Sequence, residues 1–262
     1  MQDFTSEFEF YMSKGMIDRP GNLICTGKEA LVFLTERNDG VQTSLYALKI
    51  YKGRNTRSFR HRDDYQYQII RPTRREARAL KKKSDFGKKV EEHLWHGREK
   101  DALQILNKAG AHVPQLLAQG PNSLLMTYFG DAQAPAPKLV EIRRDLPNPD
   151  GIFREIMNQI ELFLSMNIIH GDLSSYNILY ASGMFVIIDF PQAVDARTCS
   201  TARMLLERDI TAVCAFFSRL GVVCDPQLLA FDLWHRYLTN SFGDTIGNMG
   251  TDRFIGVKGA CL

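Results

Sequence analysis

The residue types with the clearest capacity for chemistry are concentrated in two short segments, HGDLSSYN at 170–177 and IDF at 188–190. Phosphoryl transfer requires an oriented nucleophile and a cation that neutralises the phosphates, with little covalent help from the protein. Asp172 supplies a carboxylate that can accept a hydroxyl proton, and Asn177, five residues later, supplies an amide oxygen for a metal. Asp189 offers a second oxygen ligand to Mg²⁺, a hard cation that prefers oxygen. The two segments therefore predict a site for phosphoryl transfer that uses ATP and Mg²⁺, with Mn²⁺ as an alternative metal.

A lysine inside an apolar segment is the second chemical signal. Lys49 interrupts the run ALKIY, where a charge costs free energy unless it is paired or bound to a ligand. We expect Lys49 to clamp the phosphates of ATP. Its natural partner is Glu99 in a predicted helix downstream, although Glu91 and Glu92 compete for this role.

Each of these acids has an ordinary explanation when it is taken alone, because Asp and Asn are also common in turns and at helix caps. Their order and spacing, together with Lys49 upstream, favour the catalytic interpretation. His170 and Phe190, which belong to the same two segments, are expected to support the backbone and the packing.

The segments that must position these residues begin with a sheet. Residues 23–51 contain three strand-like runs separated by turn residues, the first at Gly27-Lys28, which predicts an antiparallel meander. Apolar residues between 88 and 109 recur near helical spacing, and Gly110 then suits a helix C-terminus. The run LLMTYF at 124–129 predicts a buried strand.

The second half is predicted to be mainly helical. Asn148 and Asp150 can cap a helix whose apolar residues recur at three- and four-residue spacing. A further helix is predicted over about 201–220, ended by Gly221.

An Ala/Pro-rich stretch at 131–137 reads as a linker and is the predicted lobe boundary. We therefore predict an α+β, two-lobed protein-kinase-like fold. Residues 1–130 would form a small N-terminal ATP-binding lobe, an antiparallel sheet with one long helix. Residues 131–262 would form a mainly helical catalytic lobe.

Charge is distributed unevenly along a chain whose net charge is only +3. Residues 49–100 contain 17 lysines and arginines against 7 acids. Within this region, about 52–87 is polar and weakly periodic, which predicts a flexible basic loop. The loop is either a solvated surface or a site that faces phosphate, acidic protein or RNA.

Composition argues against several other classes of protein. The apolar runs are too short for a membrane span, and the N-terminus lacks the pattern of a secretory signal. The 5 cysteines are scattered without a CxxC pair, which argues against a disulfide framework and against a zinc site. We expect a cytoplasmic protein with no membrane partner.

The motifs resemble those of the RIO family of atypical serine/threonine protein kinases. Matching runs extend from about Cys25 to Phe217 and include CTGKEALVF, ALKIYK, LLMTYFG, IIHGDLSSYNILY, VIIDFPQAVD and LLERDITAVCAFF. Ordinary kinases carry a glycine-rich loop, HRD and DFG in place of TGKEA, HGDLSSYN and IDFP. The chain looks like a compact, bacterial-like member, closest to the first RIO subfamily.

The resemblance implies roles for further residues. It places four residues of one turn near the phosphates: Thr26, Gly27, Lys28 and Glu29. It also puts Thr127 and Phe129 in the hinge between the lobes, where backbone groups would meet adenine. Asp209 matches a family acid that would brace the catalytic loop, although a helical surface aspartate is the alternative.

Three functions stay open at this level. One is a serine/threonine protein kinase that also phosphorylates itself, with an unknown protein substrate. The second is a small-molecule kinase, since aminoglycoside and choline phosphotransferases share HGD and IDF, although they usually read HGDLHPGN. The third is an ATPase switch, or an assembly factor associated with RNA or the ribosome, with a transient phosphate on Asp189.

Overall fold

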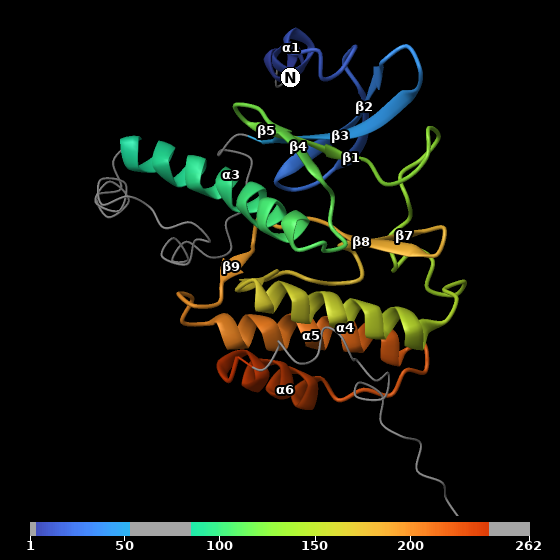
Figure 1. Cartoon of the computed structure of the whole chain (residues 1–262), viewed down its shortest axis with the longest axis vertical. Helices are drawn as coiled ribbons and strands as arrows, with labels where there is room; N and C mark the ends of the chain where they lie inside the picture. Colours follow the sequence, from blue (N-terminus) through green and yellow to red (C-terminus); the bar gives the residue numbers. More distant parts are fainter. Residues whose placement is uncertain (1–3, 53–84, 241–262) are drawn as a thin grey trace, which may run out of the picture.

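The computed structural model of the chain describes residues 4–52 and 85–240. A 5-stranded sheet forms the upper part of the molecule, and a mainly helical part lies below it (Figure 1). The first half contains helix α1 (Thr5–Ser13), strands β1 (Asn22–Thr26), β2 (Ala30–Asn38) and β3 (Thr43–Tyr51), helix α3 (Asp85–Lys108), and strands β4 (Leu116–Gln119) and β5 (Ser123–Thr127). The second half contains α4 (Pro149–Ser165), β6 (Ile168–Ile169), β7 (Ile178–Ala181), β8 (Met184–Ile187), β9 (Val194–Asp195), α5 (Ala202–Ser218) and α6 (Pro226–Leu238).

The large sheet has strand order β1-β2-β3-β5-β4, and each neighbouring pair is antiparallel. The predicted meander of three strands is confirmed. Because side chains alternate along a strand, the central strand β3 presents two different faces. Leu48 and Ile50 pack in one apolar cluster, whereas Ala47 and Tyr51 pack in another. Lys49 therefore shares its face with Ala47 and Tyr51.

Helix α1 covers one face of this sheet (Figure 1). Phe8 and Tyr11 are buried in the same cluster as Leu48. The Glu7 carboxylate accepts hydrogen bonds from the Asn122 backbone N–H at 3.1 Å and from the Ser123 hydroxyl. Apolar packing and buried polar contacts thus both fix α1 to the β4–β5 hairpin. Helix α1 was not predicted from the sequence.

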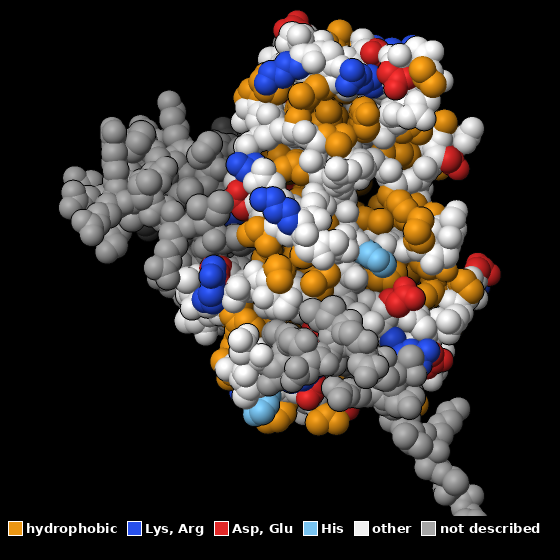
Figure 2. All heavy atoms as spheres, viewed as in Figure 1, with side chains coloured by type: hydrophobic (Ala, Val, Ile, Leu, Met, Phe, Trp, Pro, Cys, Tyr) orange, Lys and Arg blue, Asp and Glu red, His pale blue; other side chains and the backbone are white. Residues whose placement is uncertain are grey.

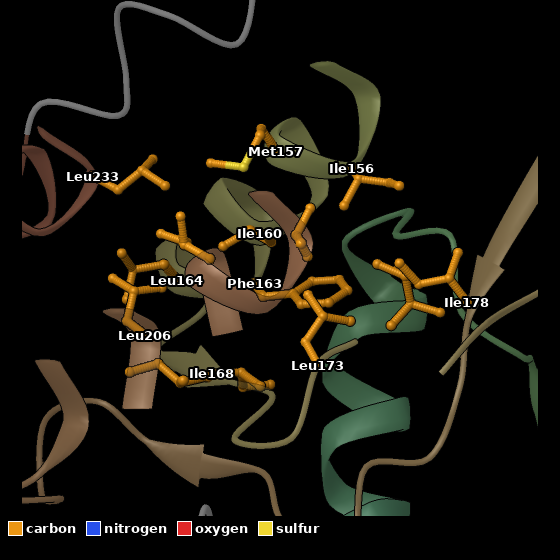
Figure 3. Packing of buried hydrophobic residues seen from close by; sticks show 14 of the residues in the cluster. Ile156, Met157, Ile160, Phe163, Leu164, Ile168, Leu173, Ile178, Leu206 and Leu233 are labelled. Carbon is orange, nitrogen blue, oxygen red and sulfur yellow. The ribbon is translucent and has the colours of Figure 1, made fainter. Parts of the chain in front are cut away.

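The largest apolar core belongs to the helical part. Side chains of α4 lie between residues of α5 and α6 on one side and Leu173 and Ile178 on the other (Figure 3). Helix α3 joins this core through three buried residues: Ala102, Leu103 and Leu106. The long helix that belongs to the first half of the sequence is therefore packed on the second half. In the space-filling view, hydrophobic side chains gather both on the sheet and beneath it (Figure 2).

The predicted helices of the second half are confirmed. Helix α4 begins after Asn148, whose side chain accepts the Gly151 N–H, and α5 ends shortly before Gly221. Helix α6 was not predicted, although its signal is present. Asp225 accepts the N–H groups of Gln227 and Leu228 immediately before a run rich in apolar residues.

The α+β, two-lobed kinase-like architecture is confirmed, and two local predictions need adjustment. Helix α3 begins at Asp85, inside the predicted basic loop 52–87, and residues 53–84 of that loop lie outside the described residues. The predicted linker contains a compact turn, in which the Asp131 carboxylate accepts two backbone N–H groups.

Across residues 4–52 and 85–240, no helix is long and apolar enough to cross a membrane.

The anchor of α1 predicts that Gly120 tolerates no side chain. A Cβ there would lie 2.4 Å from Ser123 Oγ and 2.9 Å from Glu7 Oε2. We expect Gly120→Ala to lower the free energy of unfolding by about 1–3 kcal/mol, the usual cost of overpacking. Gly97→Ala is the matched control, because a Cβ in α3 makes only an ordinary 3.7 Å contact with Asp101. Thermal melts of both variants test this, and equal melting temperatures would contradict it.

Candidate active site

Residues 170–177, called the catalytic loop after the role predicted for Asp172, are held at both ends by strands and in the middle by the core. Strand β6 precedes it and β7 follows it. Leu173 is buried beside Phe163 of α4, so the loop is pinned one residue after Asp172 (Figure 3). The Asn177 side-chain amide donates to the Asp172 carbonyl at 2.8 Å. Because the amide nitrogen makes this bond, the oxygen is the atom that Asn177 could offer to a cation, and the exposed Asp172 carboxylate lies on the surface of the loop.

Asp189 is brought next to Asn177 by strand pairing. Ile178 of β7 pairs with Ile187 of β8, and the Ile188 N–H donates to the Asn177 carbonyl at 2.9 Å. Asp189 follows directly, with a φ of 73° in the left-handed region. Such a conformation is uncommon for a non-glycine residue and is concentrated at functional sites.

Lys49 meets carboxylates from two other elements. Its Nζ lies 2.7 Å from Glu99 Oε1 on α3 and 2.6 Å from Asp189 Oδ1 after β8. The structure thus selects the expected partner Glu99, while the side chains of Glu91 and Glu92 lie outside the described part of the chain. Three segments far apart in sequence converge on one ammonium group.

The charges in this cluster reinforce one another. Burial works to lower the pKa of Lys49, but Asp189 and Glu99 outweigh it and raise that pKa above its ordinary value. Partial desolvation works to raise the pKa of Asp189, but the charge and hydrogen bond of Lys49 hold it below its usual range. Both groups are therefore ionised at neutral pH.

His170 and Phe190 support the loop, as expected. The His170 imidazole is buried, lies 3.1 Å from the Ile188 carbonyl through Nε2, and accepts the Asp172 N–H through Nδ1. Burial lowers the pKa of His170, so a neutral ring with its proton on Nε2 satisfies both bonds. The fully buried Phe190 ring packs 4.5 Å from the His170 ring.

Asp209 of α5 braces the catalytic loop, and the alternative of a surface aspartate is wrong. Its buried carboxylate accepts the Gly171 N–H at 2.7 Å and the Leu173 N–H at 3.0 Å. The neighbouring Arg208 donates to the Gly171 carbonyl. Burial raises the pKa of Asp209 to about 7, against these N–H donors, which work to lower it.

Gly171 and Gln192 connect the catalytic loop with the sheet above it. Gly171 has a φ of 76°, and a Cβ there would lie 2.4 Å from the Gln192 carbonyl oxygen. The Gln192 side chain donates to Glu29 Oε1 at 3.3 Å. The segment after Asp189 therefore touches both the catalytic loop and the β1–β2 turn. No role for Gln192 was predicted from the sequence.

The β1–β2 turn carries the residues expected near the phosphates. Thr26 ends β1, Gly27 and Lys28 are exposed, and Glu29 is half-buried before β2. Lys52, just after β3, donates through Nζ to the Gly27 carbonyl at 2.6 Å and through its N–H to the Glu29 carbonyl. The turn is thus held against the end of β3.

The two predicted hinge residues lie at and just beyond the end of β5. The Thr127 N–H donates to the Gln115 carbonyl, and the Thr127 hydroxyl accepts the Gln115 N–H, both at 2.9 Å. The Phe129 carbonyl accepts the Ala136 N–H at 3.0 Å. These bonds give the connection between the lobes a defined shape, and contact with adenine stays a prediction.

The donor set fits Mg²⁺ better than a metal that prefers nitrogen or sulfur. Asn177 and Asp189 offer oxygen atoms on adjacent backbone segments. Within residues 4–52 and 85–240, no group of three or more His, Cys, Asp or Glu side chains could hold a metal ion. Mg²⁺ typically uses one or two carboxylates and completes its shell with phosphates and water, which matches such a sparse set.

A two-lobed α+β fold, in which a strand lysine meets a helix glutamate and a strand-end aspartate, defines the protein-kinase-like class. Residues 31–229 match the family model of the RIO domain. The chain belongs to the RIO family of atypical serine/threonine-protein kinases, as its motifs indicated.

Relatives extend this comparison. The chain is 33% identical over 215 residues to the RIO-type serine/threonine-protein kinase Rio1 of Haloferax volcanii, covering 82% of this chain and 69% of that protein. It is 29% identical to the serine/threonine-protein kinase RIO3 of Mus musculus, covering 80% of this chain but only 41% of that protein. The Rio2 kinase of Chaetomium thermophilum, solved as an ADP/Mg²⁺-phosphoaspartate complex, has a similar fold, with a TM-score of 0.59. The two chains are 23% identical, and the match covers 80% of this chain and 58% of that chain.

The Asp209 brace predicts a specific pH dependence. Because the folded-state pKa is raised, protonated Asp209 stabilises the fold, and this contribution is lost as pH rises through about 7. We therefore compare the melting temperature of the wild type with that of Asp209→Asn at two pH values. The wild type should gain more over the variant at about pH 5 than at about pH 8. Glu207→Gln on the same helix is the control. A difference that grows with pH would mean that the N–H donors keep the carboxylate ionised.

Proposed function

We propose that this chain is an ATP- and Mg²⁺-dependent serine/threonine protein kinase that also phosphorylates itself. The observation that supports it most directly is the convergence of Lys49, Glu99 and Asp189 beside a loop that carries Asp172 and Asn177. The relatives named as serine/threonine-protein kinases support the same activity.

Each residue has a distinct task in this proposal. The exposed Asp172 carboxylate accepts the proton of the substrate hydroxyl. Lys49 binds the phosphates of ATP, and Glu99 holds the Lys49 ammonium in place. Asn177 and Asp189 would hold Mg²⁺, which neutralises the charge that develops on the transferred phosphate.

The remaining predicted residues would bind the nucleotide. Thr26, Gly27, Lys28 and Glu29 form the connection between β1 and β2, which would cover the phosphates. Backbone groups of Thr127 and Phe129 would meet adenine at the lobe boundary near residue 130. The division into an ATP-binding lobe before this point and a catalytic lobe after it is part of the proposal.

A second candidate is an ATPase switch in which Asp189 is transiently phosphorylated. The solved Rio2 kinase complex contains a phosphoaspartate, which favours this candidate over a small-molecule kinase. It needs the same residues, so the fate of the phosphate is what separates it from a protein kinase.

Labelled phosphate separates the candidates directly. The protein is incubated with γ-labelled ATP and Mg²⁺, and the label is then challenged with acid and with hydroxylamine. Acid-stable label on the chain or on an added protein supports the kinase, and hydroxylamine-labile label supports the switch. Label on an aminoglycoside or choline would indicate a small-molecule kinase, and no release or transfer of phosphate would contradict the proposal.

Asp172→Asn tests the proposed base. We expect turnover to fall by about 10²–10⁴-fold, the usual contribution of a general base. Affinity for ATP should stay within several-fold, since the main phosphate contacts remain. Turnover assays and ATP titrations measure the two effects. A rate near that of the wild type would remove Asp172 from this role.

Asp189→Asn tests the metal ligand. An amide keeps an oxygen but loses the charge, so the loss of activity should be larger at low Mg²⁺ than at high Mg²⁺. Asn also tolerates the left-handed backbone, and Lys49 keeps Glu99, so the fold should persist. The substitution should also eliminate any hydroxylamine-labile label. Mg²⁺ titrations of turnover, with thermal melts as control, provide the test, and an unchanged Mg²⁺ dependence at full activity would exclude this role.

A further inference from the structure

The hydroxyl of Tyr51 is hydrogen-bonded to the Lys49–Glu99 ion pair of the candidate site. Tyr51 is the last residue of β3, and it is 1% exposed. Its hydroxyl donates to Glu99 Oε2 at 2.8 Å, while Lys49 holds Glu99 Oε1 at 2.7 Å. Both oxygens of this buried carboxylate therefore have a donor, and both donors come from the same face of one strand.

The aromatic ring of Tyr51 contacts the other member of the pair. The Lys49 Nζ lies 5.8 Å from the ring centroid, within the range of a cation–π interaction. Tyr51 thus reaches the glutamate with its hydroxyl and the lysine with its ring, so one side chain touches both charges.

The backbone of Tyr51 is fixed from the neighbouring hairpin. The Tyr51 N–H donates to the Asn122 carbonyl at 3.0 Å, and the Asn122 side chain donates back to the Tyr51 carbonyl at 2.7 Å. The Asn122 N–H in turn donates to Glu7 of α1. The phenol is therefore presented to Glu99 from a clamped position.

We propose that Tyr51 is a positioning residue, whose hydroxyl locks the Glu99 carboxylate in the orientation that places Lys49 for the phosphates of ATP. A carboxylate held at one oxygen can rotate about its side-chain bonds, whereas one held at both cannot. The inference rests on the proposed function, because that function assigns Lys49 to the phosphates of ATP.

The competing explanation is that Tyr51 is a core residue whose hydroxyl needs an acceptor and finds Glu99. The two explanations differ in one measurable respect. A positioning residue acts through Glu99, so its effect on ATP use should vanish once Glu99 is removed. A hydroxyl that only stabilises the core would lower the melting temperature of the Phe variant and leave kcat/KM for ATP of the folded protein unchanged.

Tyr51→Phe isolates the hydroxyl, because the ring, its packing and its contact with Lys49 remain. We expect kcat/KM for ATP to fall by about tenfold or more, as for the loss of one hydrogen bond to a charged group. Tyr46→Phe is the matched control, since Tyr46 lies on the same strand but on the face covered by α1. It should leave ATP turnover unchanged.

The decisive measurement places Tyr51→Phe in a Glu99→Ala background. The double variant should have the same kcat/KM and the same ATP affinity as Glu99→Ala alone. If Glu99→Ala does not fold, Glu99→Leu provides the background, because it removes the charge and keeps the volume.

Three results would overturn the inference. Tyr51→Phe could match the wild type in ATP turnover, its effect could multiply with that of the Glu99 variant, or the single variant could fail to fold, which would assign the hydroxyl to folding. A wild-type protein that neither binds nor turns over ATP would instead remove the proposed function, and the inference with it.

Discussion

The buried ammonium of Lys49 is the interaction on which the arrangement of the site depends. A charge in an apolar strand is tolerated only when partners replace water, and Lys49 has two carboxylates within 2.7 Å. Glu99 is even more buried than Lys49, so removing Lys49 would leave a buried carboxylate without its counter-ion, at a cost of about 3–5 kcal/mol. Asp189 is 47% exposed, so water screens its ion pair with Lys49, and this pair contributes less to the stability of the fold. The lysine thus joins β3, α3 and the segment after β8.

Much of the candidate site could be predicted because its signals are local in sequence. Asp172 and Asn177 share one loop, and Asp189 follows the next strand pair, so their order and spacing already imply proximity. The meander and the helices α4 and α5 also followed from turn residues, caps and periodicity. In all of these cases the information lies within about 20 residues, the range over which local pattern rules operate.

What could not be predicted depends on contacts between distant segments. The sequence named Glu99 as the natural partner of Lys49, but excluding Glu91 and Glu92 depends on how α3 packs, and the burial of Asp209 depends on where α5 meets the catalytic loop. Gln192 shows no pattern of its own, and its contact with Glu29 exists only in the folded chain. Helix α1 was missed because its apolar residues are separated by acids, one of which, Glu7, is buried by partners on another element.

Helix α1 and strand β1 lie before the segment that matches the RIO domain, and most of α6 lies after it. A recombinant fragment cut at residues 31 and 229 would therefore differ from the folded unit. It would carry β2 as an uncovered edge, which invites association between copies, and it would expose the cluster beneath α1 to water. It would also lose Arg236, the ion-pair partner of the buried Glu161. The matched segment also omits the β1–β2 turn proposed to cover the phosphates, so the boundary for expression and crystallisation is set by the elements that close the sheet and the helical core.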